Sequence, residues 1–374
     1  MGSVDVFSKA KSMDFPRSVI LGHDAILKTR DLCDSLKFGE AGVMVTGGES
    51  YSAAGRAICE SMSERYDVRV VRTGIANSEG VDRVCAEVEG SGASFILAVG
   101  GGSKIDTAKM AAKKTGMPFV SIPTSVSHDG IASDRASLKS DAGSNSVAAV
   151  SPIGIIADTS VISAAPYRYL ASGCADVISN LTALKDWELA RKEKSEEFSS
   201  SAYFLAKYAA DNLVENCGLI KSGMEESVWL VMRPIIASGI SMCAAGSSRP
   251  TSGSEHMFSH ALDTLYPGKK SLHGEQCGIG AIMMMCLHGG DWKTILEALR
   301  TIGAPTTAEE LELADDDIIE ALVMARSMRE DRYTILGDKG ISRREARSVA
   351  KRTGVIGGRR RRSHRQKPPC ESPE

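Results

Sequence analysis

The chain has 374 residues, of which 43% are hydrophobic and 25% are charged. This composition is typical of a soluble globular protein with two or three domains, and it excludes a fully disordered chain, a collagen-like fibre and a small disulfide scaffold. With 45 Lys and Arg residues against 47 Asp and Glu residues, the net charge is −2. The overall charge therefore gives no reason to expect a nucleic-acid partner.

The charge is unevenly distributed along the chain. Residues 353–374 contain six basic and two acidic residues, so the preceding residues carry 39 basic and 45 acidic side chains. The main body is mildly acidic, and the basic extension has no interleaved aromatic residues. We expect residues 358–374 to form a basic, disordered tail.

The cysteines and the hydropathy of the chain indicate where in the cell the protein would be located. Nine cysteines, an odd number, are spread over the chain without a C-x-x-C pair, which predicts reduced thiols and a cytoplasmic location. The N-terminal segment lacks the apolar core of a signal peptide. The longest apolar stretches, such as residues 279–287, reach only about half of the ~20 residues that a membrane helix requires. We therefore expect no membrane insertion.

The first 160 residues alternate short apolar runs with amphipathic stretches. The pattern predicts strands at 41–48, 68–73, 93–102 and 118–125, with helices between them at 52–66, 79–89 and 104–116. This alternation is typical of a doubly wound parallel sheet. Beyond about residue 160, long helical patterns dominate, at 175–194, 200–218 and 225–246. We predict an α/β domain over 1–161 and an all-α domain over 162–357.

Three glycines at the end of the third predicted strand favour a phosphate-binding turn. The segment LAVGGGSKID over 97–106 places them directly before a helix, where backbone N–H groups and the helix dipole attract anions. The segment matches neither the G-x-G-x-x-G nor the P-loop pattern, so a turn that needs glycine only for its conformation is equally compatible with it. A second polar turn over 123–133, containing His128 and Asp129, could close over the same ligand.

Three of the seven histidines fall within 18 residues, which favours a metal site. His256 and His260 are four residues apart on one helix face, and His273 is expected in a short loop before the next helix. Catalytic metal sites commonly use three protein ligands and keep one position open. Asp176, expected at the start of a helix, is the best candidate to complete the set, although spacing does not exclude Asp158 or Asp263.

Five motifs are informative when taken together: GGGSKID, PTSVSHDGIAS, ADVISN followed by KDWELA, RPTSGSEHMFSHALD, and HGEQCGIG. They resemble the sn-glycerol-1-phosphate dehydrogenase family, part of the metal-dependent superfamily of glycerol dehydrogenase, iron-type alcohol dehydrogenases and dehydroquinate synthase. The likeness runs from about residue 15 to residue 357. The last two of these motifs are specific to this branch, whereas GGGS is shared by the superfamily. The resemblance implies a dehydroquinate synthase-like fold.

The resemblance also implies individual roles. The zinc ligands would be Asp176, His256 and His273. Asp129, Asp176 and His260 would contact the substrate, and Asp129 or His260 would relay a proton. Residues of the two polar turns would hold NAD or NADP: Gly102, Ser103, Lys104, Ile105, Asp106, Thr124, Ser125, Val126, Ser127 and Ser133.

The implied reaction is the NAD(P)H-dependent reduction of dihydroxyacetone phosphate to sn-glycerol 1-phosphate, which supplies the glycerophosphate backbone of archaeal-type membrane lipids. The alternatives are a glycerol dehydrogenase, a non-redox lyase like dehydroquinate synthase, and a non-catalytic metal- or nucleotide-binding protein. The preference between NADH and NADPH stays open, and the ligand set would also accept iron, nickel or cobalt. We expect a homo-oligomer. The substrate phosphate would need cationic or N–H partners, and Arg249 and Lys269 or Lys270 lie near the histidine motifs, but cations at such positions are more typical of a solvated surface.

Overall fold

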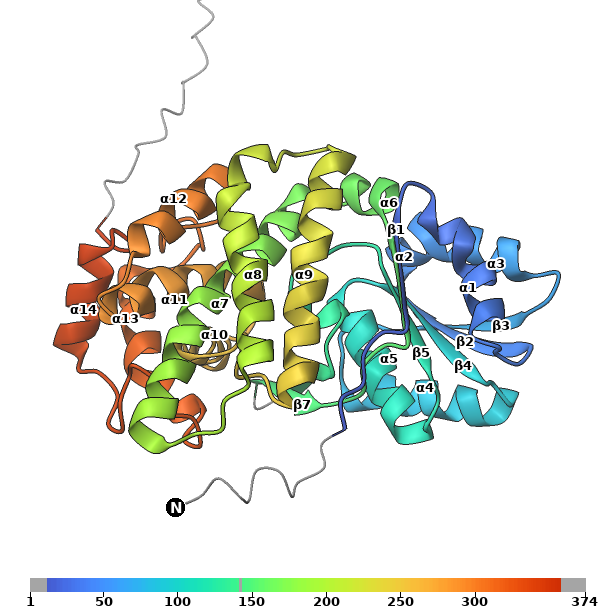
Figure 1. Ribbon diagram of the computed structural model, residues 1–374, viewed down its shortest axis with the longest axis horizontal. Helices are drawn as coiled ribbons and strands as arrows, with labels where there is room; N and C mark the ends of the chain where they lie inside the picture. The colour runs from blue at the N-terminus through green and yellow to red at the C-terminus, as the bar shows by residue number, and fades with distance from the viewer. Residues whose placement is uncertain (1–11, 141–142, 358–374) are drawn as a thin grey trace, which may run out of the picture.

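The computed structural model describes residues 12–140 and 143–357, so the predicted tail over 358–374 lies outside the described residues. A parallel sheet with helices on both faces forms one part of the molecule, and a group of helices forms the other (Figure 1). The strands are β1 (Ser18–Gly22), β2 (Ala41–Thr46), β3 (Asp67–Arg72), β4 (Phe95–Gly100), β5 (Phe119–Pro123), β6 (Arg135–Ser140), β7 (Gly143–Ala148) and β8 (Gly154–Asp158).

The helices divide between the two parts of the molecule. Those of the sheet part are α1 (Thr29–Ser35), α2 (Gly48–Ser50), α3 (Arg56–Met62), α4 (Ser78–Ser91), α5 (Gly102–Thr115) and α6 (Thr159–Ala164). Those that follow are α7 (Tyr167–Lys194), α8 (Ser200–Glu215), α9 (Glu225–Ala245), α10 (Ser254–Leu265), α11 (His273–Leu287), α12 (Trp292–Ile302), α13 (Asp315–Met324) and α14 (Arg343–Arg352). The predicted domain boundary at residue 161 falls within α6, and the division into domains stays a prediction.

The sheet has six parallel strands in the order β1-β8-β5-β4-β2-β3. Its two faces are read directly from the alternation of side chains along a strand. In β2, Val43 and Val45 pack with residues of α4 and α5, whereas Met44 packs with residues of α1 and α3. Both faces are therefore covered by helices, and the predicted α/β fold is confirmed.

Two strands of this sheet were missing from the sequence-based prediction. β1 and β8 pair with each other along their whole length, and β8 also pairs with β5. Neither strand is followed by a helix of ordinary length, because β1 leads into a short 3₁₀ turn and β8 into the six-residue α6. The strand–helix alternation that revealed the other strands is therefore absent here.

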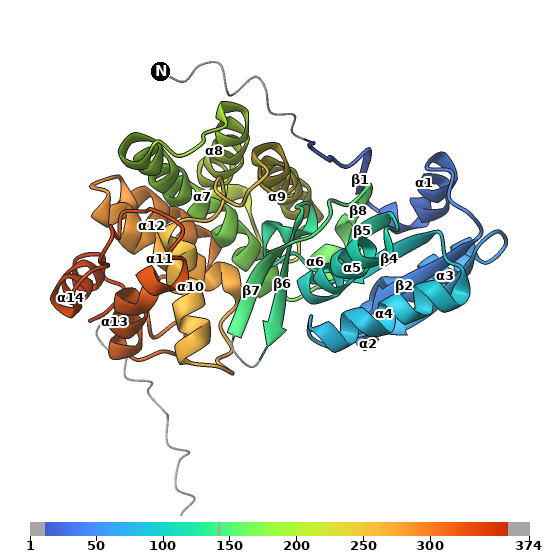
Figure 2. The same cartoon turned by 90° about the horizontal axis from the view of Figure 1, so that it is seen from below.

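A hairpin formed by β6 and β7 was also not predicted. The two strands pair in antiparallel register, from Arg135 opposite Ala148 to Ser140 opposite Gly143. Their sequences, RASLKS and GSNSVA, are too small and polar to show a strand pattern. The hairpin lies between the sheet part and the helical part, where β6 contacts α5 and β7 contacts α10 (Figure 2).

The helical part is built around α7, which packs against α8, α9, α10, α11 and α12. Within the described residues, α9 is the one helix long and apolar enough to cross a membrane, with a mean hydropathy of 1.6. However, 61% of its apolar window is buried inside the protein, and α8 packs along it. The composition of α9 is thus explained by its place in the core.

Candidate metal centre and active site

A cavity of about 750 Å³ lies between the sheet part and the helical part. On one side it is lined by the turns that follow β2, β4 and β5, at the carboxyl ends of the strands. On the other side it is lined by Asp176 of α7, His256 and His260 of α10, and His273 of α11. Ligands of open parallel sheets bind at this edge, so the cavity brings the two predicted sites together.

The turn after β4 approaches the turn after β5 very closely. A Cβ atom on Gly102 would lie 2.0 Å from Nε2 of His128, and one on Gly101 would lie 2.8 Å from Oγ of Ser125. Both glycines are therefore required by packing, because any side chain would push the two turns apart. Gly102 is also the first residue of α5, and the free N–H groups at a helix N-terminus can bind an anion.

Most of the residues predicted to hold the cofactor line the cavity: Gly102, Ser103, Lys104, Asp106, Thr124, Ser125, Ser127 and Ser133. Ile105 and Val126 do not, since their side chains are 0% and 1% exposed and belong to the hydrophobic core. These two residues could contact a ligand only through their backbones. A cofactor role for the whole set stays a prediction.

Lys109 is a buried cation that sequence reasoning did not single out. Its Nζ donates hydrogen bonds to the backbone oxygens of Gly130 and Arg135 and, at 3.2 Å, to Oγ of Ser133. It also lies 3.8 Å from Oδ1 of Asp106, and burial raises the pKa of that carboxyl group. Lys109 thus fixes the turn that carries Asp129 onto helix α5.

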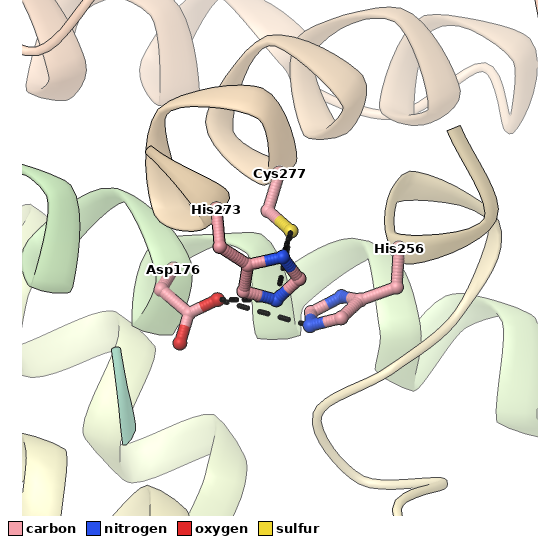
Figure 3. A group of neighbouring side chains, drawn as sticks. All are labelled: Asp176, His256, His273 and Cys277. Carbon is pink, nitrogen blue, oxygen red and sulfur yellow. Dashed lines mark hydrogen bonds and ion pairs between the residues drawn. The ribbon is translucent and has the colours of Figure 1, made fainter. Parts of the chain in front are cut away.

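Asp176, His256 and His273 converge at the cavity wall from three different helices (Figure 3). Oδ1 of Asp176 lies 3.7 Å from Nε2 of His256 and 3.7 Å from Nε2 of His273. The same Oδ1 is buried and has no hydrogen-bond partner among the described residues. One carboxylate oxygen facing two imidazole nitrogens is a donor set that suits a divalent metal, and it leaves a position open.

Each of these three side chains is oriented by a second contact. Oδ2 of Asp176 accepts a hydrogen bond from the backbone N–H of Asp129 at 3.0 Å. Nδ1 of His256 lies 2.9 Å from Oε1 of Glu255, and Nδ1 of His273 lies 3.0 Å from Oγ of Ser259. Such outer contacts fix the ligand atoms in place and are typical of metal sites. Burial and the nearby Asp129 carboxylate raise the pKa of Asp176 to about 6.

Two local expectations about this group were wrong. Asp176 does not begin a helix, because α7 already starts at Tyr167 and places Asp176 in its buried middle. His273 does not lie in a loop, because it is the first residue of α11. The capping carboxylate of Glu275, which accepts the N–H of Leu272 at 2.8 Å, starts the helix earlier than expected.

The structure also distinguishes Asp176 from its rivals. Asp158 caps α6 by accepting the N–H groups of Ser160 and Val161. Asp263 accepts a hydrogen bond from Nε2 of Gln276 at 3.1 Å. Neither belongs to the group of candidate metal ligands, and only Asp176 meets the two histidines.

Cys277 joins this group and was missed in the sequence. Its Sγ lies 3.6 Å from Nε2 of His273, and its side chain is 0% exposed. The spacing of four residues between His273 and Cys277 on one helix face could have revealed it. Unlike the other three residues, Cys277 does not line the cavity, and burial raises the pKa of its thiol to about 12.

His260 lies one turn beyond His256 on α10, outside the group of candidate ligands. Its ring centroid is 6.1 Å from that of His273, and its Nδ1 is buried without a hydrogen-bond partner among the described residues. Burial and nearby positive charge lower the pKa of His260 to about 4. The imidazole is therefore neutral at physiological pH and faces the cavity.

The start of α10 is fixed by two buried carboxylates. Oδ2 of Asp186 accepts the N–H of Ser254 at 2.7 Å and its hydroxyl at 2.6 Å, and Oε1 of Glu255 accepts the N–H of Gly253 at 2.6 Å. A Cβ on Gly253 would lie 2.5 Å from Oδ2 of Asp186. The glycine and the two acids in this motif thus set the position of both histidines on α10.

Known proteins resemble this chain over most of its length. Residues 20–166 match the family model described as iron-containing alcohol dehydrogenase. The chain is 47% identical to the glycerol-1-phosphate dehydrogenase [NAD(P)+] of Methanospirillum hungatei, over 91% of this chain and 94% of that protein. It is 49% identical to the enzyme of the same name from Methanothermobacter thermautotrophicus, over 92% and 99%.

Solved structures show the same fold at lower identity. Glycerol dehydrogenase from Schizosaccharomyces pombe matches with a TM-score of 0.75 at 18% identity, covering 92% of this chain and 90% of that chain. A probable glycerol dehydrogenase from Sinorhizobium meliloti matches with a TM-score of 0.71 at 21% identity, covering 92% and 98%. The predicted fold is confirmed, and the identity to the two archaeal enzymes shows that the chain belongs to the glycerol-1-phosphate dehydrogenase family.

Proposed function

We propose that the protein reduces dihydroxyacetone phosphate with NADH or NADPH, giving sn-glycerol 1-phosphate and the oxidised cofactor. The observation that carries this proposal is the convergence of Asp176, His256 and His273 in the same cavity as the glycine-rich turn at Gly102. A dehydrogenase needs an electrophilic site for the carbonyl and a bound nicotinamide within reach of it. Family membership favours this reaction over a glycerol dehydrogenase or a non-redox lyase.

The cofactor would lie along the turns at the carboxyl ends of β4 and β5. Its pyrophosphate would meet the N-terminus of α5 at Gly102 and Ser103, where N–H groups and the helix dipole favour an anion. Thr124, Ser125 and Ser127 would provide hydroxyl and backbone contacts from the facing turn. In this arrangement the nicotinamide ring would reach the metal side of the cavity.

Asp176, His256 and His273 would hold the divalent metal, for which we propose zinc. Oδ1 of Asp176 is buried and has no hydrogen-bond partner among the described residues. It is therefore free to bind a metal, which supports this assignment. When bound, the metal would polarise the substrate carbonyl as a Lewis acid, and the nicotinamide would supply the hydride. The cavity position of the three ligand side chains would leave access for the substrate.

His260 or Asp129 would relay to the developing alkoxide the proton that the reduction consumes. The neutral imidazole of His260 can take a proton at one ring nitrogen while giving one up at the other. Asp129 is held in place by Ser238, whose hydroxyl donates to Oδ2 at 2.7 Å, and Ser238 is held in turn by Nδ2 of Asn180 at 2.8 Å. This chain orients the carboxylate at the cavity wall, next to Asp176.

The test is a rate measurement with the metal-loaded protein. Dihydroxyacetone phosphate should drive oxidation of NADH or NADPH, and a chelator should abolish the rate. Glycerol with the oxidised cofactor should be a far poorer substrate. Rapid turnover of glycerol without turnover of dihydroxyacetone phosphate would instead identify a glycerol dehydrogenase. A cytoplasmic location and a homo-oligomeric state stay predictions from the sequence.

A further inference from the structure

Resting on the proposed function, we propose that Arg332 and the loop residues Ser248 and Ser252 form the anion subsite that binds the substrate's phosphate group, beside His260. Ser248 and Ser252 lie between α9 and α10, and both line the same cavity as the candidate metal ligands. Thr251 of the same loop also lines it. This part of the wall therefore offers hydroxyl groups within the cavity that the candidate metal ligands also line.

Arg332 does not itself line the cavity, but it contacts two of these wall residues from behind. Its Nη1 donates to the backbone oxygen of Ser252, and its Nη2 donates to Oγ of Ser248 at 3.1 Å. The residue is only 7% exposed, and within residues 12–140 and 143–357 no carboxylate forms an ion pair with it. Burying a guanidinium without a counter-ion is unfavourable in free energy. An anionic ligand would therefore be stabilised near Arg332.

The neighbouring Arg249 shows the contrast. It is equally buried, but its Nε and Nη2 both donate to the carboxylate of Glu196. Its charge is already neutralised, and its burial contradicts the solvated surface position expected from the sequence. Among the described residues around Ser248 and Ser252, Arg332 is the buried cation without an ion pair.

The lysines named from the sequence are also poorly placed. Lys269 is exposed, and its Nζ lies 5.9 Å from the ring centroid of Tyr266 and 4.0 Å from Oδ2 of Asp317. Neither Lys269 nor Lys270 lines the cavity. Three cations of the sheet part also line the cavity. Lys104 donates to the backbone oxygen of Gly74, and Arg135 lies 3.3 Å from Oδ1 of Asp134. Lys139 is exposed, and its charge opposes the rise that burial causes in the pKa of Asp263.

The positive charge reaches the part of the cavity that the substrate would occupy. Burial lowers the pKa of the His260 imidazole most, followed by the nearby His256, and Arg329 and Arg332 are near enough to lower it further. Arg329 itself is paired with Asp331 at 3.1 Å. Asp263, an acidic lining residue, accepts a hydrogen bond from Gln276. The region around His260 therefore retains a positive field from Arg332.

The distances suit a three-carbon phosphate ester. His260 and His273 have ring centroids 6.1 Å apart, and only a few bonds separate the carbonyl carbon of such a substrate from its phosphorus. A carbonyl oxygen facing Asp176, His256 and His273 would thus bring the phosphate to the His260 end of the cavity. There the hydroxyls of Ser248 and Ser252, backed by Arg332, would receive it, because guanidinium and hydroxyl donors suit phosphate oxygens.

The experiment compares a phosphorylated with an unphosphorylated substrate. Holoenzyme is assayed with dihydroxyacetone phosphate and with dihydroxyacetone, as wild type, Arg332→Met, Ser248→Ala and the exposed-cation control Lys269→Met. Loss of a charge-assisted contact should raise the KM for dihydroxyacetone phosphate by about 10- to 100-fold in Arg332→Met and by a smaller factor in Ser248→Ala. The efficiency with dihydroxyacetone should fall far less than the efficiency with dihydroxyacetone phosphate in both variants, and Lys269→Met should match wild type on both substrates.

Equal losses on the two substrates would overturn the proposal, because they would indicate a structural role, and so would an unchanged KM for dihydroxyacetone phosphate. If Arg332→Met does not fold, Ser248→Ala carries the same comparison, since it leaves Arg332 in place. Inorganic phosphate, titrated calorimetrically into protein saturated with NADH, separates this proposal from the proposed function. Binding to wild type that is lost in the variants supports the subsite even if the enzyme turns over another phosphorylated substrate, and absence of binding contradicts it.

Discussion

The backbone N–H of Asp129 donates a hydrogen bond to Oδ2 of Asp176 at 3.0 Å. This contact joins the turn after β5 to the helix that carries the candidate metal ligand. Two further contacts reinforce it, since Oγ of Ser172 donates to the oxygen of Ser127 at 2.9 Å and a Cβ on Gly173 would lie 2.8 Å from the oxygen of Val126. These contacts therefore fix the position of the cofactor side of the cavity relative to the metal side.

The two histidines of α10 should respond differently to removal. His256→Ala should lose the bound metal and with it the activity, because its Nε2 faces Oδ1 of Asp176. His260→Ala should keep the metal and lose turnover by about 100-fold or more, the usual size of a general acid–base contribution. Metal content by atomic absorption, measured beside kcat, checks both. Metal loss in His260→Ala with retention in His256→Ala would reverse the two assignments.

Cys277→Ser should retain stoichiometric metal and most of the activity. The thiol lies beside His273 but does not line the cavity, whereas three other donors already do. A fourth protein ligand would close a tetrahedral shell and leave no position for the substrate. Cobalt-substituted protein provides the measurement, because a thiolate ligand adds an intense near-ultraviolet charge-transfer band. Such a band in wild type that disappears in Cys277→Ser would show that Cys277 is a ligand after all.

Gly102→Ala should weaken cofactor binding. The added methyl group would lie 2.0 Å from Nε2 of His128, whose Nδ1 accepts a hydrogen bond from the N–H of Gly130 at 3.0 Å. The turn must therefore move, and we expect the KM for NADH or NADPH to rise about tenfold or more. Gly90→Ala is the matched control, since its Cβ would meet nothing within 4 Å. Similar KM values for wild type and Gly102→Ala would show that this close approach has no part in cofactor binding.

Asp186→Ala should destabilise the fold, although Asp186 contacts none of the residues proposed to bind the metal or relay the proton. The buried carboxylate accepts bonds from Ser254, from Nε2 of His288 at 2.9 Å and from the N–H of Ile335 at 2.7 Å. Leaving these donors unpaired should cost about 3–5 kcal/mol. Thermal unfolding checks this against Asp291→Ala, which removes only the exposed N-cap of α12 and should lower the Tm less. Equal Tm values for the two variants would contradict the role given to Asp186.

The sequence was informative wherever periodicity and local chemistry coincide. Strands β2, β4 and β5 are apolar runs that end in glycine or polar turns, and His256 and His260 share a helix face, so both the sheet and the histidine pair could be predicted. The hairpin of β6 and β7 has no such pattern.

Contacts between residues distant in the sequence could not be predicted in the same way. Arg332 reaches Ser248 and Ser252 from a loop after α13, and nothing in the local sequence connects them. Residue spacing alone could not separate Asp176 from Asp158 and Asp263; the family resemblance pointed to Asp176, and the fold shows the reason, because it brings α7 to α10 and α11. Burial is the property that sequence patterns miss in each of these cases, because it depends on how the helices pack.

The central claim is the identity of the reaction, and the stereochemistry of the product tests it most directly. Metal-loaded protein is incubated with dihydroxyacetone phosphate and NADH or NADPH, and the glycerol phosphate formed is assigned to one enantiomer with a stereospecific coupling enzyme. We expect sn-glycerol 1-phosphate as the one product, formed in equal amount with the oxidised cofactor. A chelator should abolish its formation. Formation of sn-glycerol 3-phosphate, or no cofactor oxidation with this substrate, would contradict it.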